Sequence, residues 1–240
     1  MIISSLLSFF FPLHCSLCGS SDNLLPDTFL CAPCCGDIRL NINACPHCAE
    51  PVPEGVGYNS QVCGRCLHKA PVYDRCWSPF VYAQPLEWMI QQLKFAEKLN
   101  FAPLLSNLMC EHLPLTHYQQ HPPDVIIPMP LHSRRLKQRG FNQSQMLVKP
   151  LAELLGVPVD SYSAQRLRDT EHQTGKNVRQ RQLNMKGAFS FDNKCDYQYA
   201  VIFDDVITTG SSVTELCKTM KRAGVSRVDV WSLARAERLR

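Results

Sequence analysis

The sequence lacks any run of about 20 apolar residues, the length that a transmembrane helix requires. It also lacks the basic flank and the A-x-A-like cleavage site of a secretory signal, although residues 1–14 are apolar. We therefore expect a chain that neither spans a membrane nor is exported, with a reducing cytosol as its compartment. Residues 1–14 are expected to form a short helix that packs its Leu and Phe side chains on the rest of the protein.

A strong net charge is absent as well, because 25 Lys and Arg residues oppose 21 Asp and Glu residues in the 240-residue chain. The cations are unevenly placed: eleven of the 25 lie between Arg134 and Lys186, where only four acidic residues occur. This segment is expected to contact an anion. It contains few aromatic residues, Phe141 and Tyr162, so the sequence gives little support to a base-stacking platform for single-stranded DNA.

Cysteine is abundant, with thirteen residues. Eight of them form four C-x-x-C pairs in the first third of the chain, which are Cys15, Cys18, Cys31, Cys34, Cys45, Cys48, Cys63 and Cys66. In a reducing compartment metal is favoured over disulfides, and this spacing predicts two structural Zn²⁺ sites with four thiolates each. We prefer sequential pairing, the first four and then the second four, although spacing alone also permits an interleaved arrangement.

The other five cysteines have no partner spacing and are expected to be buried small apolar residues. They are Cys35, Cys76, Cys110, Cys195 and Cys217. His14, His47 and His68 lie near the C-x-x-C pairs, but four thiolates already complete each site. We expect these histidines at the surface or beside the ligands.

Residues 199–212 read Y-A-V-I-F-D-D-V-I-T-T-G-S-S and predict a strand, a phosphate-binding loop and the start of a helix. Ser211 or Ser212 is expected to be the helix N-cap. Orphan N–H groups at a helix N-terminus suit a phosphate, whereas the two carboxylates suit ribose hydroxyls or Mg²⁺. The alternative is an ordinary strand-to-helix turn. On the first interpretation a sugar phosphate would contact Asp204, Asp205, Val206, Thr208, Thr209, Gly210, Ser211 and Ser212.

Two basic stretches follow predicted strands. Residues 124–130 are expected to form a buried strand, after which come Arg134, Arg135, Lys137 and Arg139. We expect these side chains to bind a pyrophosphate group, because ligands bind at the carboxyl ends of parallel strands and guanidinium groups match phosphate geometry. The alternative is a basic loop that contacts only solvent. Residues 166–184 form a polar stretch that we expect to close as a lid. Its candidate anion-binding side chains are Arg166, Arg168, Lys176, Arg179 and Arg181.

Hydrophobic patterning predicts an α/β fold with a doubly wound parallel sheet. Strands are expected at 77–82, 157–160, 187–191 and 228–233, helices at 85–98 and 101–113, and a linker at 117–123. A helix is expected from Gly140 to about Leu155, kinked or interrupted by Pro150. We place the boundary between a zinc module, residues 1–76, and the α/β domain, residues 77–240, where the cysteine spacing stops.

The motifs C-x-x-C, P-M-P-L-H-x-R-R-L-K-x-R-G-F-N-Q, L-R-D-T-x-x-Q-x-G, R-x-x-N-x-x-G-A-F and F-D-D-V-I-T-T-G occur in this order. This series resembles the ComF family of bacterial phosphoribosyltransferase-like proteins with an N-terminal double zinc ribbon. The resemblance implies a type I phosphoribosyltransferase fold, phosphoribosyl pyrophosphate (PRPP) and Mg²⁺ as ligands, and a role in DNA uptake or DNA utilisation. Single-stranded DNA or proteins of the uptake machinery would be its partners.

If the protein is an enzyme, we expect a nitrogen nucleophile to attack C1 of PRPP and pyrophosphate to leave. The groups that would carry this reaction are Asp204, Asp205, Arg134, Arg135, Lys137, Arg168 and Arg181. Enzymes that salvage 6-oxopurines have an aspartate where this chain has Thr208, which argues against hypoxanthine or guanine as acceptor. An orotate-like acceptor, an amide-like acceptor or none remains. The alternative is a non-catalytic, PRPP-responsive adaptor for single-stranded DNA or a protein.

Overall fold

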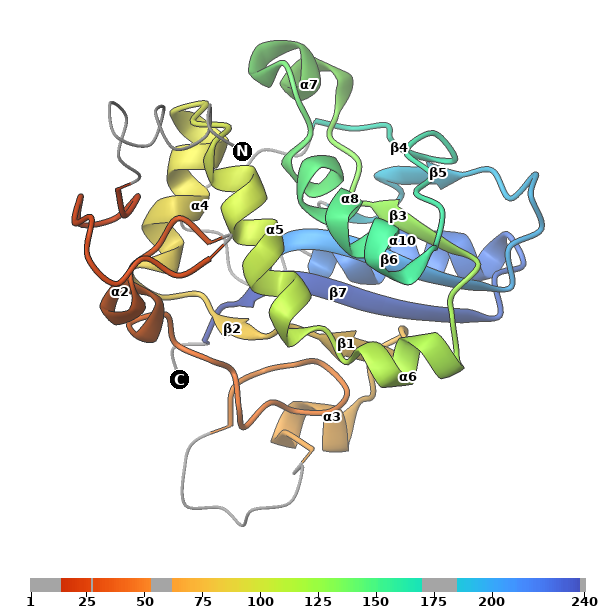
Figure 1. Ribbon diagram of the computed structural model, residues 1–240. Helices are drawn as coiled ribbons and strands as arrows, with labels where there is room; N and C mark the ends of the chain where they lie inside the picture. Colours follow the sequence, from red (N-terminus) through yellow and green to blue (C-terminus); the bar gives the residue numbers. More distant parts are fainter. Residues whose placement is uncertain (1–13, 27, 53–61, 170–184, 238–240) are drawn as a thin grey trace.

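The computed structural model describes residues 14–26, 28–52, 62–169 and 185–237 (Figure 1). The predicted helix within residues 1–14 therefore falls almost wholly outside the described residues. The same holds for most of the predicted lid, including Lys176, Arg179 and Arg181.

A parallel sheet forms the centre of the protein, in the strand order β1-β7-β6-β3, with β2 also paired to β7. The strands are β1 (Arg75–Trp77), β2 (Phe80–Val81), β3 (Val125–Pro128), β6 (Tyr199–Ile207) and β7 (Arg227–Arg235). Every pairing in this sheet is parallel, and β6 pairs in register with both β3 and β7. β3 is buried at each of its four positions, as a strand covered on both faces must be.

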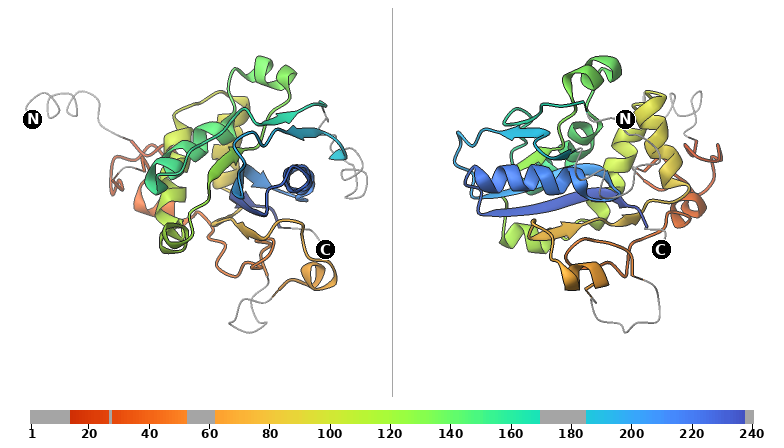
Figure 2. Two further views of the ribbon diagram at one scale, coloured as in Figure 1. Left: turned by 90° about the vertical axis from the view of Figure 1, so that its right-hand side faces the viewer. Right: turned by 180° about the vertical axis from the view of Figure 1, so that it is seen from behind.

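Alternate residues of the strands point into two separate cores. Ile126 and Phe203 lie in one core with the helices α4 (Leu86–Phe95), α5 (Phe101–His112) and α8 (Gln143–Leu155). Ile127 and Ile202 lie in the other core with the buried face of α10 (Ser211–Arg222). Figures 1 and 2 show α10 on the face of the sheet opposite to α5 and α8. The predicted doubly wound parallel sheet is confirmed.

Most predicted elements are present, but several differ from the prediction. The predicted strand at 77–82 is divided between β1 and β2, and the strand at 187–191 is reduced to Phe189–Phe191, which pairs antiparallel outside the main sheet. α8 runs through Pro150 without interruption, capped by Asn142 and ended by Gly156, because its buried face packs on α5 and the sheet. The alternative of a kink at Pro150 stays a prediction. The predicted strand at 157–160 is reduced to a single bridge, from Ile126 to Val159. The predicted linker at 117–123 contains most of a helix, α6 (Leu115–Gln120).

Tyr118 explains why α6 forms where the prolines and polar residues suggested a linker. Its ring is buried against Trp231 of β7, with ring centroids 4.6 Å apart. Its hydroxyl accepts a hydrogen bond of 2.7 Å from the indole N–H of Trp231. One aromatic residue thus anchors a polar helix to the sheet.

A two-stranded antiparallel unit, β4 (Ala164–Arg166) with β5 (Phe189–Phe191), lies apart from the main sheet. The N-terminal part of the chain contains two short helices, α2 (Ala32–Gly36) and α3 (Gly64–His68), each beginning directly after a C-x-x-C cysteine. β1 spans the boundary that we place after residue 76, and that boundary stays a prediction. None of the helices in the described ranges is long and apolar enough to cross a membrane.

Candidate functional site

Two clusters of four thiols occupy the N-terminal part of the chain. In each cluster the Sγ atoms lie within 4.8 Å of one another. The first contains Cys15, Cys18, Cys31 and Cys34, and the second Cys45, Cys48, Cys63 and Cys66. Sequential pairing is therefore confirmed. The Sγ atoms of Cys18 and Cys31 are 3.6 Å apart, which fits tetrahedral Zn–S bonds of about 2.3 Å.

All eight members of the two clusters are cysteines, and neither cluster includes a histidine from the described residues. Four thiolates leave no open position, so a Zn²⁺ ion held there would stabilise the fold without binding substrate. Of the five remaining cysteines, Cys76 and Cys217 are buried as expected. Cys35 and Cys110 are only half-buried, and Cys195 is exposed, so the prediction for Cys195 is wrong.

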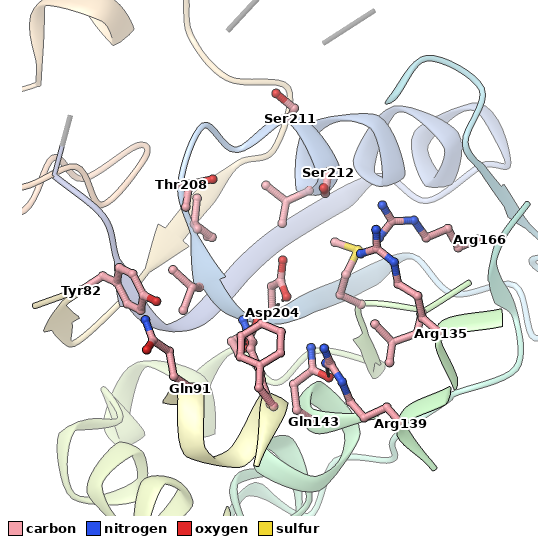
Figure 3. A pocket seen from close by; sticks show the side chains of 18 of the residues that line it. Tyr82, Gln91, Arg135, Arg139, Gln143, Arg166, Asp204, Thr208, Ser211 and Ser212 are labelled. Atoms are coloured by element: carbon pink, nitrogen blue, oxygen red, sulfur yellow. Dashed lines mark hydrogen bonds and ion pairs between the residues drawn. The ribbon is translucent and has the colours of Figure 1, made fainter. Parts of the chain in front are cut away.

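A cavity of about 710 Å³ opens at the carboxyl ends of β3 and β6 (Figure 3). Its lining includes every residue from Asp204 to Val213, together with Arg135. The sugar-phosphate residues predicted from the sequence are thus gathered at one cavity. Side chains from three other segments complete its wall: Tyr82, Gln91, Lys94, Phe95, Glu97, Met129, Leu131, Gln138, Arg139, Gln143 and Arg166.

The predicted phosphate loop connects β6 to α10. Gly210 has a left-handed backbone, with φ +75°, and is the N-cap of α10. The expectation that Ser211 or Ser212 is the cap is wrong, because both belong to the first turn and the left-handed cap position favours glycine. The Thr209 hydroxyl accepts a hydrogen bond of 3.4 Å from the Ser211 N–H. The first turn of α10 therefore faces the cavity with hydroxyls and backbone N–H groups.

The acidic pair differs in environment. Asp205 is 3% exposed, and its carboxylate forms an ion pair with the Lys94 ammonium of α4. Burial acts to raise the pKa of Asp205, but the Lys94 ammonium outweighs it and lowers that pKa. Burial and the Asp205 carboxylate raise the pKa of Asp204 to about 8. At neutral pH one negative charge and one protonated carboxyl group therefore share the floor of the cavity.

The cationic wall faces this pair. Arg135, Arg139 and Arg166 line the cavity, and Figure 3 shows Arg135 and Arg166 side by side. Arg135 donates a hydrogen bond of 3.1 Å to Asp169, and Arg139 donates one of 2.6 Å to the buried Gln143. Burial and the Arg135 charge lower the pKa of Arg166. Crowded guanidinium groups of this kind attract an anion with several charges.

Among the residues that the structure describes, the other predicted cations lie outside the lining of the cavity. Arg134, with a side chain 80% exposed, and Lys137 lie on the short helix α7 (Ser133–Arg139), which follows β3. Arg168 is exposed, and its guanidinium donates to the Lys186 carbonyl. Arg181 lies outside the described residues.

The two basic motifs meet in space although about 30 residues separate them. His132 and Arg166 form a parallel bridge, and Asp169 pairs with Arg135 across the same junction. Residues of the motif that ends in R-G-F-N-Q, together with Arg166 directly before the motif L-R-D-T, therefore lie on one side of the cavity. Their shared contact explains how a strand of the small antiparallel unit can present Arg166 beside Arg135.

Several lining residues were missed from the sequence, above all Lys94, Tyr82, Gln91 and Gln143. Gln143 lies inside the quoted motif and could have been included. Lys94 directly follows Leu93 in the apolar stripe of α4, a position common for a solvated lysine. Nothing in its local pattern distinguishes it, because only packing of α4 against the sheet brings it to Asp205.

Comparison with known proteins matches residues 6–67 to a family model described as a double zinc ribbon domain. The DNA utilization protein YhgH of Salmonella typhi is 38% identical over 208 residues, covering 86% of this chain and 90% of that protein. Competence protein F of Haemophilus influenzae is 33% identical over 233 residues, covering 95% and 99%. Competence protein ComFC of Bacillus subtilis is 26% identical over 196 residues, covering 79% and 77%.

Among solved structures, the glutamine PRPP amidotransferase of B. subtilis in complex with ADP and GMP matches with a TM-score of 0.40 and 15% identity. The match covers 60% of this chain and 30% of that enzyme, and so distant a likeness supports no conclusion about ligand or reaction. The relatives named above are much closer and span nearly their whole length. On their similarity, the chain belongs to the ComF family of competence and DNA-utilisation proteins.

Proposed function

We propose that the cavity at the carboxyl ends of β3 and β6 binds PRPP together with Mg²⁺, and that the protein serves DNA uptake or utilisation as a phosphoribosyltransferase-like protein. One observation carries the proposal: an acidic pair, a phosphate loop and three arginines line a single cavity. The names of the relatives, DNA utilization protein and competence protein, support the cellular role. Two clusters of thiols suit a reducing compartment, and we place the protein in the cytosol.

The parts of PRPP match the parts of the cavity. The 5′-phosphate suits the loop from Thr208 to Ser212, where hydroxyls and a helix N-terminus meet. The ribose hydroxyls suit the carboxyl groups of Asp204 and Asp205. The pyrophosphate suits Arg135, Arg139 and Arg166, whose side chains can each donate two parallel hydrogen bonds.

The residues fit a Mg²⁺ ion that arrives with the ligand. Mg²⁺ in proteins is usually held by one or two carboxylates together with phosphate oxygens and water. Asp205 already pairs with Lys94, which leaves Asp204 as the carboxyl group to contact the metal. When bound, the ion would neutralise charge on the leaving pyrophosphate.

If the protein is an enzyme, a nitrogen nucleophile attacks C1 of PRPP, the bond from C1 to the pyrophosphate oxygen breaks, and pyrophosphate leaves. The arginine wall stabilises the charge that develops on the leaving group. The pKa of Asp204 favours a protonated carboxyl group before the ligand binds, so binding through its ionised form releases a proton. Thr208 is exposed and offers no carboxylate to an acceptor base, which disfavours 6-oxopurines.

A second candidate is a PRPP-responsive adaptor without catalysis. The exposed cations outside the cavity favour it: Arg134, Lys137 and Arg168 lie where a macromolecular phosphate can reach them. Single-stranded DNA or an uptake protein with an acidic surface would be the partner. Release of pyrophosphate from PRPP with candidate bases separates the two, since tight PRPP binding with no turnover for any base favours the adaptor.

Calorimetric titration of PRPP in Mg²⁺ tests the binding site shared by both candidates. Asp204→Ala combined with Asp205→Ala should abolish PRPP binding, and Asp192→Ala, a change in an exposed ion pair with Lys194, should leave the affinity unchanged. Retained affinity in the double variant would refute the site. For the adaptor, affinity for single-stranded DNA should fall steeply with salt, and an absent salt slope excludes contact with DNA phosphates.

A further inference from the structure

Arg235, the last residue of β7, is a charged side chain buried in the protein, with 1% exposure. Its Nε donates a hydrogen bond of 3.0 Å to the Cys48 carbonyl. One terminal nitrogen donates to the Ile207 carbonyl at 2.7 Å and also to the Thr208 carbonyl. The other terminal nitrogen lies 3.4 Å from the Glu50 carboxylate. A single planar group therefore contacts two regions that are far apart in the sequence.

The two sides of this guanidinium have different neighbours. On one side, the carbonyls of Ile207 and Thr208 belong to the turn that leads into the phosphate loop. On the other, Cys48 is a member of the second thiol cluster. Glu50 strengthens the link, because it also pairs with Arg65 at 3.4 Å, next to Cys66 of the same cluster. Cys48, and Arg65 beside Cys66, are thus connected to the loop through contacts with Arg235 and Glu50.

A guanidinium holds its acceptors in fixed directions, and buried carbonyls that lose their donors are destabilised. The conformation of the turn at Ile207 and Thr208 therefore depends on the position of the Arg235 side chain. That position depends in turn on the backbone at Cys48. The first thiol cluster lies elsewhere: Cys15 and Cys31 are part of the core with α4 and α5, whereas Cys45, Cys48 and Cys66 are part of the core with α10.

We propose that Arg235 is a positioning residue that couples metal occupancy of the second thiol cluster to the shape of the phosphate loop. Zinc at the second cluster fixes the Cys48 backbone, Arg235 passes that position to Ile207 and Thr208, and the loop is held ready for its anion. Zinc at the first cluster has no such effect. The consequence for ligand affinity rests on the proposed function, whereas the coupling itself does not.

Hydrogen exchange of the intact protein, read on residues 206–212, tests the coupling without any ligand. Arg235→Lys keeps the positive charge but removes the planar guanidinium with its several donors in fixed directions. Cys63→Ser removes one thiol of the second cluster. Both should raise exchange in this segment about tenfold. The matched control is Cys18→Ser in the first cluster, which should lose one zinc and change exchange by less than about twofold. Unchanged exchange in β3, Val125–Pro128, shows that each variant is folded.

Glu50→Gln provides a second route if Arg235→Lys does not fold, because Glu50 is partly exposed and all eight thiols remain. It should also raise loop exchange while zinc stays at two ions per chain. Equal exchange in the variants of both clusters, or an unchanged loop in Arg235→Lys or Glu50→Gln, overturns the coupling. A parallel titration with PRPP distinguishes failure of the coupling from failure of the proposed function. If the wild-type protein does not bind PRPP, the proposed function fails, while the exchange results still decide the coupling.

Discussion

Lys94 of α4 forms an ion pair with Asp205 of β6 in the floor of the cavity, although 110 residues separate them in the sequence. The Asp205 side chain is 4% exposed and that of Lys94 20%. The pair sets the charge of the floor, because Lys94 keeps Asp205 ionised and the Asp205 carboxylate helps to keep Asp204 protonated. A helix outside the phosphate loop therefore controls the electrostatics of the residues expected to hold the ribose.

Lys94→Met should lower the free energy of unfolding at pH 7 by about 3 kcal/mol, because it leaves the buried Asp205 carboxylate without its cation. Urea denaturation measures the change. Asp205→Asn in the Lys94→Met background should recover most of the loss. Lys149→Met is the matched control, since Lys149 pairs with Glu153 at the surface and should contribute less than about 1 kcal/mol. Equal losses for Lys94→Met and Lys149→Met would contradict the assignment.

The raised pKa of Asp204 leads us to expect that the free energy of unfolding depends on pH. Its pKa is raised to about 8 in the folded protein, so its contribution to stability is complete below its ordinary pKa and is lost as pH rises through about 8. Asp204→Asn cannot ionise and should become more stable relative to wild type between about pH 5 and about pH 9. Thermal unfolding across this range measures the difference. A flat difference for Asp204→Asn would contradict the raised pKa.

The strand, the acidic pair and the loop that leads into α10 could be predicted from the sequence because their signals are local. Phosphate binding by this loop stays a prediction. Residues 199–212 contain in one short segment an apolar run, two carboxylates and a glycine followed by an amphipathic helix. The thiol clusters were predictable for the same reason, since each C-x-x-C pair brings two ligands together by itself. Gly210 could have been considered as the cap, because glycine is among the residues accepted at helix N-caps.

The remaining wall could not be predicted because it depends on tertiary packing. Lys94 reaches the cavity only through the docking of α4, and Arg166 reaches Arg135 only through the bridge at His132. Within the basic stretch, periodicity did not separate Arg135 from Arg134. The turn of α7 decides which of the two faces the cavity. Tyr118 likewise turned a predicted linker into a helix through its contact with Trp231.

The neighbours Arg134 and Arg135 provide a direct test of the cationic wall. Arg135→Met should weaken binding of PRPP or of pyrophosphate by about tenfold or more, because it removes a charged donor from the cavity. Arg134→Met should change that affinity by less than about twofold, because its side chain is 80% exposed and outside the lining. Calorimetry with each ligand checks both. A stronger effect of Arg134→Met would place the pyrophosphate on the outer face of α7.

The thiol clusters predict the metal content. Denaturing the purified protein in the presence of a zinc-sensitive dye should release two Zn²⁺ ions per chain, because the two clusters each offer four Sγ atoms within 4.8 Å. Cys48→Ser should lower the content to one ion. Cys217→Ser should leave it at two, because Cys217 lies on the buried face of α10 and belongs to neither thiol cluster. One ion or none in the wild-type protein would contradict the two-site assignment.

The pairing of β1 with β7 affects where the chain can be truncated to express the α/β part alone. Arg75, Cys76 and Trp77 cover one edge of β7 by parallel pairing, nine residues after the last thiol of the second cluster. A chain that begins at residue 77 would expose hydrogen-bonding groups of β7 around Asp229 and Val230, and an uncovered strand edge invites pairing with another molecule. A fragment that contains the α/β part should therefore start upstream of β1. Without this three-residue strand, we expect the fragment to aggregate through the uncovered edge of β7.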